Sequence, residues 1–515
     1  MLKQKACRTT FGGDGGGEPR VPIPNTTVKP SSADGTWTAG SWKSRTSPST
    51  DNRPYSIWSV FFVIKKDFVI ALSNEFRYDF IYSRGTDTTV TIPKEMPLVW
   101  SRIQGNARNC LLYEPLFLLP YNMYMTYASI YMLKLGVNET QIGLITSIGM
   151  AIQIFTALIS GHLTDKMGRR KALIVYDLLS WSVATLIWAV SQNFWFFLVA
   201  AIVNSFQRVP TTAWYCLLVE DTKPENRSIV FTILMFINVV GGLFAPLGGL
   251  LVNHFELVPG MRVMYVIAFI GMTIMMILRH INTHETDIGI KKMQESSKIS
   301  FSDTLAEYKS VLKLIVTNKP LMIIFGVYIL FNFQMTLRNT YLSVYWVDAL
   351  KINDALISIF PAISSAAMIL FLLTATPRLK EKLANRYMIW GFLISAASFI
   401  ILLSAGPDNI AATIISTVVM AIGGILASPY LESSIQNAID DDNRAKIFSI
   451  LGVLILIFTF PAGLIGGWAY SINAKIPLIF IVISFLMSVP MMVMYARGSR
   501  NAIQPSVEMT CSTDV

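Results

Sequence analysis

Residues 140–171 read TQIGLITSIGMAIQIFTALISGHLTDKMGRRK. The first part of this stretch, 140–163, is apolar on most faces of a helix. Its length is close to the roughly 20 residues that a helix needs to cross about 30 Å of hydrocarbon. The stretch then ends in a cluster of lysines and arginines. An apolar run that stops at a basic cluster is typical of a membrane-spanning helix that emerges on the cytoplasmic side.

Similar apolar runs occur on both sides of this stretch. The chain has 515 residues, of which 53% are hydrophobic and 14% charged, and its mean hydropathy is +0.50. One soluble core could not bury so many apolar side chains. The runs are longer than the alternating strands of a membrane barrel. We therefore predict an all-α polytopic membrane protein with twelve transmembrane helices, at about 109–134, 140–163, 172–190, 194–219, 228–252, 261–281, 319–347, 353–375, 386–405, 409–436, 445–471 and 474–496.

The orientation follows from the basic residues of the short loops, because positive residues resist translocation. With a cytoplasmic amino terminus, the inner loops hold twelve of them, namely Lys166, Arg169, Arg170, Lys171, Lys223, Arg227, Arg378, Lys380, Lys382, Arg386, Arg444 and Lys446. The outer loops hold four, namely Lys134, Arg262, Lys351 and Lys475. We predict that the N and C termini are both cytoplasmic. The net charge of +10 then needs no nucleic-acid partner, and the scattered cysteines and histidines predict neither metal nor cofactor.

Composition divides the chain into five parts. Residues 1–95 are predicted to be either a disordered region or an upstream extension of the reading frame before Met96. Residues 96–281 form an N-terminal six-helix half, and 319–497 form a C-terminal six-helix half. A polar cytoplasmic central loop, 282–318, separates them, and 498–515 form a cytoplasmic tail.

The two halves contain matching segments. Residues 163–170 align with 379–386 at an offset of 216, and residues 225–233 align with 442–450 at an offset of 217. In both pairs the Leu, Asn or Phe positions match as well as the basic ones, so basic inner loops alone do not explain the alignment. We predict two pseudo-symmetric six-helix bundles with a solute site between them near the membrane midplane.

The segment Gly161-His-Leu-Thr-Asp165-Lys-Met-Gly168-Arg169-Arg170-Lys resembles the signature that major facilitator superfamily transporters carry between helices 2 and 3. The resemblance covers about 390 residues and implies the fold of that family. It also implies a conformational latch in which glycine permits close helix approach and the charged residues bridge helix ends. The latch partners are expected among Asp177, Glu220 and Asp221. The alternative is that the basic residues only set the topology.

Two Gly- and Pro-rich segments are similar to a signature of proton-coupled antiporters in the same superfamily. They are 241–249 in the fifth predicted span and 460–467 in the eleventh. Ala245 stands where that signature has glycine before Pro246, and one residue is missing before the next glycine pair. The resemblance implies export, but small residues at close helix contacts would give the same pattern in an importer.

Charged residues inside spans mark transport pathways, because lipid penalises them. In span 4, Arg208 shares a helix face with Asn204, and Trp214 lies near that face. A guanidinium there could bind a carboxylate or phosphate of a substrate, or form a structural ion pair. Asp177 in span 3 is expected to form a structural or gating pair rather than to contact substrate.

Three other spans carry comparable stripes. Glu114 precedes Pro115 in span 1 and shares a stripe with Tyr121, which makes it the first candidate for a proton carrier, or else a surface residue at the helix end. In span 7, Arg338 shares a face with Gln334. Glu432 in span 10 is the fourth charged candidate. The alternative role for these charged residues is to form ion pairs between helices.

These features predict a secondary active transporter that works by alternating access. Proton-coupled efflux is favoured, and import of a sugar-like or small anionic nutrient is the alternative; a membrane sensor that no longer transports is a third reading. The sequence contains no Gly-x-x-x-x-Gly-Lys-[Ser/Thr] loop, so we do not expect ATP-driven pumping. It contains no His-Glu-x-x-His metal pair or nucleophile constellation, so we do not expect an enzyme. The expected partners are a small-molecule substrate, protons and the lipid bilayer. The expected form is a multi-pass monomer in a cell membrane.

Overall fold

The computed structural model describes residues 103–295, 317–375, 383–437 and 444–503, the single positions 315 and 379, and two short strands. The strands β1 (Asp79–Phe80) and β2 (Val90–Thr91) pair antiparallel. The rest of the predicted N-terminal extension lies outside the described residues. So do residues 380–382 and 442–443 of the matching segments in the second half.

The first six predicted spans are built from eleven α-helices and two short helical turns. They are α3 (Gly105–Tyr113), α4 (Pro115–Met125), α5 (Ala128–Lys134), α6 (Glu139–Met167), α7 (Arg169–Asp177), the π-helical turn η1 (Leu178–Val183), α8 (Ala184–Val190), α9 (Phe194–Asn204), the 3₁₀ turn η2 (Ser205–Gln207), α10 (Arg208–Val219), α11 (Pro224–Gly242), α12 (Pro246–Phe255) and α13 (Leu257–Asn282). A helix that was not predicted, α14 (Asp287–Glu295), follows in the central loop.

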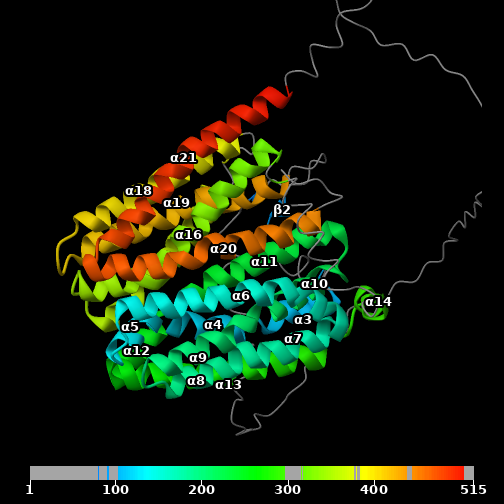
Figure 1. Ribbon diagram of the computed structural model, residues 1–515, viewed down its shortest axis with the longest axis horizontal. Coiled ribbons are helices and arrows are strands. Elements are labelled where there is room, and N and C mark those ends of the chain that lie inside the picture. The colour runs from blue at the N-terminus through cyan, green and yellow to red at the C-terminus, as the bar shows by residue number, and fades with distance from the viewer. Residues whose placement is uncertain are drawn as a thin grey trace, which may run out of the picture. The chain divides into compact units, whose positions relative to one another are not determined.

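The second six spans are less divided. They are α16 (Lys319–Asp348), the 3₁₀ turn η4 (Asp354–Leu356) with α17 (Ile359–Thr374), α18 (Ala384–Ser404), α19 (Ile410–Asn437), α20 (Arg444–Ile472) and α21 (Ile476–Ile503). The last helix continues six residues beyond the predicted boundary at 497. Figure 1 shows α16 and α18–α21 gathered on one side and the helices of the first half on the other.

Ten helices of the described residues are long and apolar enough to cross a membrane. The remaining two predicted spans, 109–134 and 194–219, are interrupted. In the first, Pro115 has no backbone N–H to continue the hydrogen-bond ladder, and α3 ends just before Glu114. The second carries Asn204, Gln207 and Arg208 around the turn η2, which lowers its apolarity.

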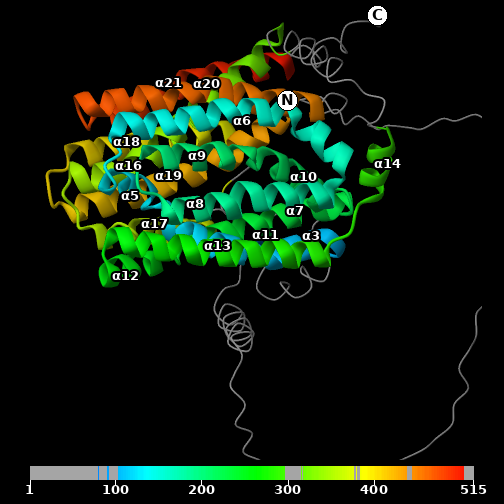
Figure 2. The same cartoon turned by 60° about the horizontal axis from the view of Figure 1, so that its bottom comes forward.

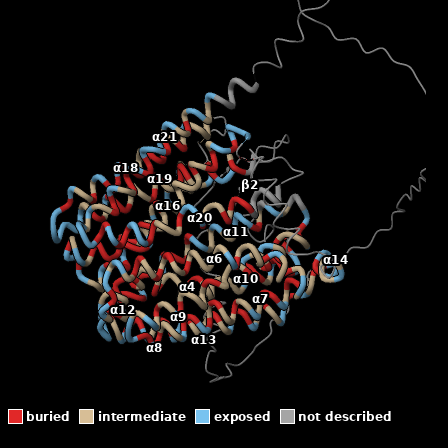
Figure 3. Tube along the Cα trace, in the orientation of Figure 1, coloured by how far each residue is buried: buried red, intermediate tan, exposed pale blue. Residues whose placement is uncertain are grey.

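Burial follows the pattern that lipid requires. Buried positions lie between helices, and exposed ones lie on the outward faces (Figure 3). Many of the exposed side chains are large and apolar, including Phe155, Trp195, Leu250 and Ile281. An apolar surface of this kind is stable in hydrocarbon and costly in water. The chain is therefore a multi-pass membrane protein, as predicted.

Glycines join the two halves along α6 and α20, which lie side by side in both views (Figures 1 and 2). A Cβ atom on Gly143 of α6 would overlap the backbone carbonyl of Gly463 in α20. Next to them, the Ser147 hydroxyl donates to the carbonyl of Phe460 at 2.5 Å and accepts the N–H of Leu464 at 2.9 Å. The backbones of the two halves are therefore in direct contact here.

A second contact between the halves uses the Gly- and Pro-rich segment. Cβ atoms on Gly242 and Gly249 would overlap the hydroxyls of Ser365 and Ser358 of the other half. Lys134 lies 3.7 Å from Asp354 across the same boundary. Among the described residues, the hydrogen bonds and the ion pair that join the halves all lie toward the ends predicted to face outward.

Replacing Gly143 with alanine should weaken the contact between α6 and α20, because the added methyl group has no room beside Gly463. We expect a loss of about 1–3 kcal/mol, the usual cost of overpacking, seen as a lower melting temperature in detergent. Gly161→Ala is the matched control, because no atom lies within 4 Å of a Cβ built there. Equal melting temperatures for the two variants would contradict the close contact.

Candidate functional site

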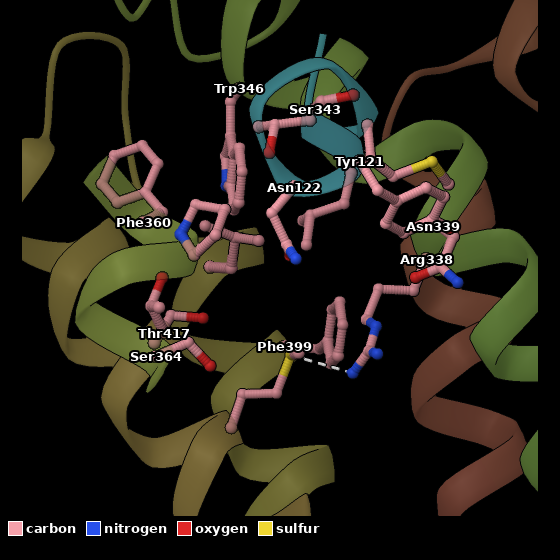
Figure 4. Close-up of a pocket in the computed structure, with 17 residues that line it drawn as sticks. Tyr121, Asn122, Arg338, Asn339, Ser343, Trp346, Phe360, Ser364, Phe399 and Thr417 are labelled. Atoms are coloured by element: carbon pink, nitrogen blue, oxygen red, sulfur yellow. Dashed lines mark hydrogen bonds between the residues drawn. The ribbon is translucent and has the colours of Figure 1, made fainter. Parts of the chain in front are cut away.

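A cavity of about 360 Å³ lies between the two halves (Figure 4). The first half contributes α4, and the second contributes α16, α17, α18 and α19. In Figure 4 the Asn122 amide and the Arg338 guanidinium point into the space that Ser364 and Thr417 border from the other side. Its walls also include the rings of Trp346, Phe360 and Phe399. Polar groups and aromatic rings thus face one space that both halves enclose.

A second cavity, also of about 360 Å³, adjoins the first and reaches into the first half. The two share Tyr121, Met125 and Asn339 as lining residues. The second is rich in aromatic side chains, including Tyr124, Trp181, Trp188 and Tyr265. We call the pair of cavities the central site.

Three predicted pathway residues line the central site. Tyr121 lines both cavities, Arg338 lines the first and Asn204 lines the second. Arg208 stands one contact away, because its Nε donates to Gln153 Oε1 at 2.9 Å and Gln153 lines the second cavity. The helix-face reasoning thus leads from three separate spans to one region.

Glu114 is not among the lining residues of the central site. Its Oε2 lies 3.7 Å from Nη1 of Arg279, whose Nη2 donates to Asp177 Oδ2. The side chains of Arg279 and Asp177 are buried, and that of Glu114 is only 12% exposed. Three helices, α3–α4, α7 and α13, therefore meet at one arginine shared by two carboxylates.

The other predicted pathway residues also lie outside the two cavity linings. Glu432 is exposed on α19. Gln334 is buried in α16, and its Oε1 forms no hydrogen bond with the described residues. The indole Nε1 of Trp214 also forms no hydrogen bond with the described residues. Trp181 and Trp188, which the sequence did not single out, line the second cavity.

The predicted latch residues form a charged cluster at the junction of α6 and α7. Arg169 Nη1 lies 2.7 Å from Asp165 Oδ1, and its Nε lies 3.2 Å from Glu220 Oε1. Gly168 adopts a φ of 83°, a left-handed conformation that favours glycine. The N–H groups of Arg169 and Arg170 donate to Glu285 at 2.9 and 3.0 Å. A carboxylate thus caps the positive end of α7.

Three latch predictions differ from the observed contacts. Gly161 has no close neighbour at its Cβ position, so it does not bring helices together in this structure. Asp177 pairs with Arg279 rather than with the latch arginines. Asp221 accepts from the Asn106 amide at 2.6 Å and lies 3.3 Å from His284 Nε2. Burial raises the pKa of Asp221 above its usual range, although His284 and Asn106 oppose that shift.

Sequence reasoning missed two residues that organise these clusters. Arg279 sits within the sixth predicted span, so the rule that singled out the other intramembrane charges applied to it as well. Glu285 lies in the predicted central loop and carried no signal of its own. Among the described residues, no group of three or more His, Cys, Asp or Glu side chains is placed to hold a metal ion.

Residues 116–454 match the family model described as the Major Facilitator Superfamily. An uncharacterized MFS-type transporter of Bacillus subtilis, YqjV, is 25% identical over 131 residues, which are 25% of this chain. The aligned segment spans 32% of that relative's length.

Two solved structures are similar in fold. A POT family transporter in complex with 5-aminolevulinic acid has a TM-score of 0.59 and 13% identity, covering 79% of this chain and 100% of its own. The nucleoside transporter NupG has a TM-score of 0.53 and 16% identity, covering 76% and 99%. Sequence identities this low show only that the folds are similar.

The substitution Arg279→Leu should destabilise the protein strongly, because it leaves two carboxylates without their cation. We expect a loss of about 3–5 kcal/mol, typical of a broken buried ion pair, read as a lower melting temperature in detergent. The triple variant Arg279→Leu, Glu114→Gln, Asp177→Asn should recover much of it. Arg262→Leu, at an exposed arginine of the same helix, is the control. An Arg279→Leu protein as stable as this control would refute the ion-pair cluster.

Proposed function

The chain belongs to the Major Facilitator Superfamily, and from that membership we propose that it is a proton-coupled exporter of a small organic solute. It is an MFS-type transporter. We propose further that it acts as a monomer in a cell membrane and works by alternating access. In that mechanism the two halves rock about a central solute site, which opens first to one side and then to the other.

The central site carries this proposal. Both halves contribute its walls, so a relative rotation of the halves changes its access. Polar ties between the halves, such as Lys134 with Asp354 and Ser147 with Phe460, lie toward the predicted outer ends. Breaking these ties while forming new ones at the inner ends would open the cavity outward. Because both halves form the wall of the cavity, a movement of one half against the other would open or close it. The arrangement therefore favours gated transport over binding at a fixed site.

The cluster of Glu114, Asp177 and Arg279 supports proton coupling. One arginine serves two carboxylates, so one negative charge remains uncompensated unless a proton binds. A buried uncompensated charge is costly, and protonation removes that cost. Glu114 also stands where α3 gives way to α4, the helix that brings Tyr121 and Asn122 to the central site. Proton binding here could therefore change the position of a cavity wall.

The export direction rests on the Gly- and Pro-rich resemblance. Gly242 and Gly249 lie at close contacts between the halves, which also suits an importer. The second candidate function is therefore import of a small anionic nutrient. Arg338 favours it, because a cavity arginine that has no carboxylate partner among the described residues attracts anions.

Proton-coupled export can be tested with inside-out vesicles that have an acidified lumen and contain a pH-sensitive dye. Cationic drugs, sugars and organic acids are added in turn. We expect a transported compound to collapse the proton gradient with the unmutated protein and with the control Arg262→Gln. Glu114→Gln should not support the response, because it removes a proton-binding group. If no compound acts in vesicles but intact cells accumulate one, the protein is an importer.

A further inference from the structure

The guanidinium of Arg338 has unusual neighbours for a charge inside a membrane protein. Its Nη2 lies 2.9 Å from the sulfur of Met335, and its Nη1 lies 3.9 Å from the sulfur of Met420. Thioether sulfur is a weak acceptor, whereas a guanidinium offers five N–H donors. Within the described part of the chain, no carboxylate lies within ion-pair distance of Arg338. Its donors therefore lack strong acceptors from the protein.

Two other buried arginines show how differently a structural charge is treated. Arg279 contacts Asp177 and Glu114, and Arg169 contacts Asp165 and Glu220. Each has two carboxylates. Arg208 has no carboxylate partner among the described residues, but its Nε donates to the amide oxygen of Gln153 at 2.9 Å. The thioether surroundings therefore set Arg338 apart. An unpaired charge at this depth is costly, and a bound anion would remove that cost.

The remaining lining fits an anion as well. Neither cavity includes an aspartate or glutamate among its described lining residues, so no protein charge there would repel a carboxylate or attract a cation. Hydroxyl and amide groups of Asn122, Asn339, Ser364 and Thr417 surround the same space (Figure 4). These groups can donate to the oxygens that Arg338 does not reach.

The second cavity indicates what the rest of the ligand is like. Tyr121 packs edge-on against Trp181 with ring centroids 6.0 Å apart, and Phe117 does so at 4.9 Å. Tyr124, Trp188 and Tyr265 continue this aromatic wall. Aromatic ligands gain stacking and edge-to-face contacts on such surfaces beyond simple burial. Each cavity has the volume of a small-molecule pocket.

We infer that the central site binds an aromatic organic anion, with its acidic group on Arg338 and its ring among Tyr121, Trp181 and Trp188. Tyr121, Met125 and Asn339 line both cavities, so one ligand can occupy the two at once. This inference names the substrate class of the proposed transporter. It rests on the proposed function only where it gives the bound anion a role in transport. Binding itself holds whichever direction the solute moves.

The test is calorimetric titration of the full chain in lipid nanodiscs. The probes are 2-naphthoate, its neutral isostere 2-naphthamide, the cation 2-naphthylmethylammonium and the non-aromatic anion cyclohexanecarboxylate. We expect 2-naphthoate to bind most tightly. Arg338→Gln should weaken 2-naphthoate by about 10- to 100-fold, the worth of a charged hydrogen bond, and leave 2-naphthamide nearly unchanged. Arg338→Lys should lie between, because it keeps the charge but loses the planar fork.

Trp181→Leu should weaken both naphthalene compounds by about 3- to 10-fold and leave cyclohexanecarboxylate little changed. The matched controls are Arg262→Gln and Trp195→Leu, at exposed positions away from the central site. Size-exclusion chromatography shows that each variant is folded. Equal affinity for 2-naphthoate and 2-naphthamide, or 2-naphthoate binding that survives Arg338→Gln, would overturn the inference even if vesicles export another solute. Binding as expected without any gradient response would instead overturn proton-coupled export.

Discussion

Hydrocarbon offers no hydrogen-bond partner, and this constraint orders the polar side chains of the whole protein. A charged side chain within the bilayer must be paired with another side chain, face the ligand site, or lie at a helix end. Arg279 and Arg169 are neutralised by carboxylates from neighbouring helices. Arg208 has an amide oxygen, and Arg338 has two sulfurs. The arginines with carboxylate partners hold helices together, whereas Arg338, which lines the cavity, has only weak acceptors beside it.

The fold could be predicted because hydrophobic length is a local property. The apolar run of the sixth span was expected to end at 281, and α13 ends at Asn282. Breaks within spans were not predicted, since a hydropathy average does not register the missing N–H of Pro115. The helix α14 was missed for a different reason. It follows Glu285, which is held by the first turn of α7 more than a hundred residues earlier, and no local pattern records such a contact.

The site was predictable only to the level of helix faces. Tyr121, Asn204 and Arg338, which polar stripes singled out, line the two cavities. A stripe could not separate Glu114 from Tyr121, although the first faces Arg279 and the second faces the central site. A polar stripe shows which side of a helix carries the polar residues. It does not show which side chain of another span each of them contacts. For the same reason Trp214 and Trp181 could not be ranked, because both are large aromatic residues in apolar runs.

The lone charge of Arg338 also has an electrical consequence. In the proposed alternating-access cycle, the guanidinium of Arg338 would travel uncompensated through part of the transmembrane field when the empty cavity turns from one side of the membrane to the other. A full elementary charge crossing 100 mV changes its free energy by about 2.3 kcal/mol. A monoanionic ligand on Arg338 would cancel that charge. Voltage would then act mainly on the return of the empty carrier and would leave the loaded step nearly insensitive, so the membrane potential would set the turnover rate through the unloaded protein.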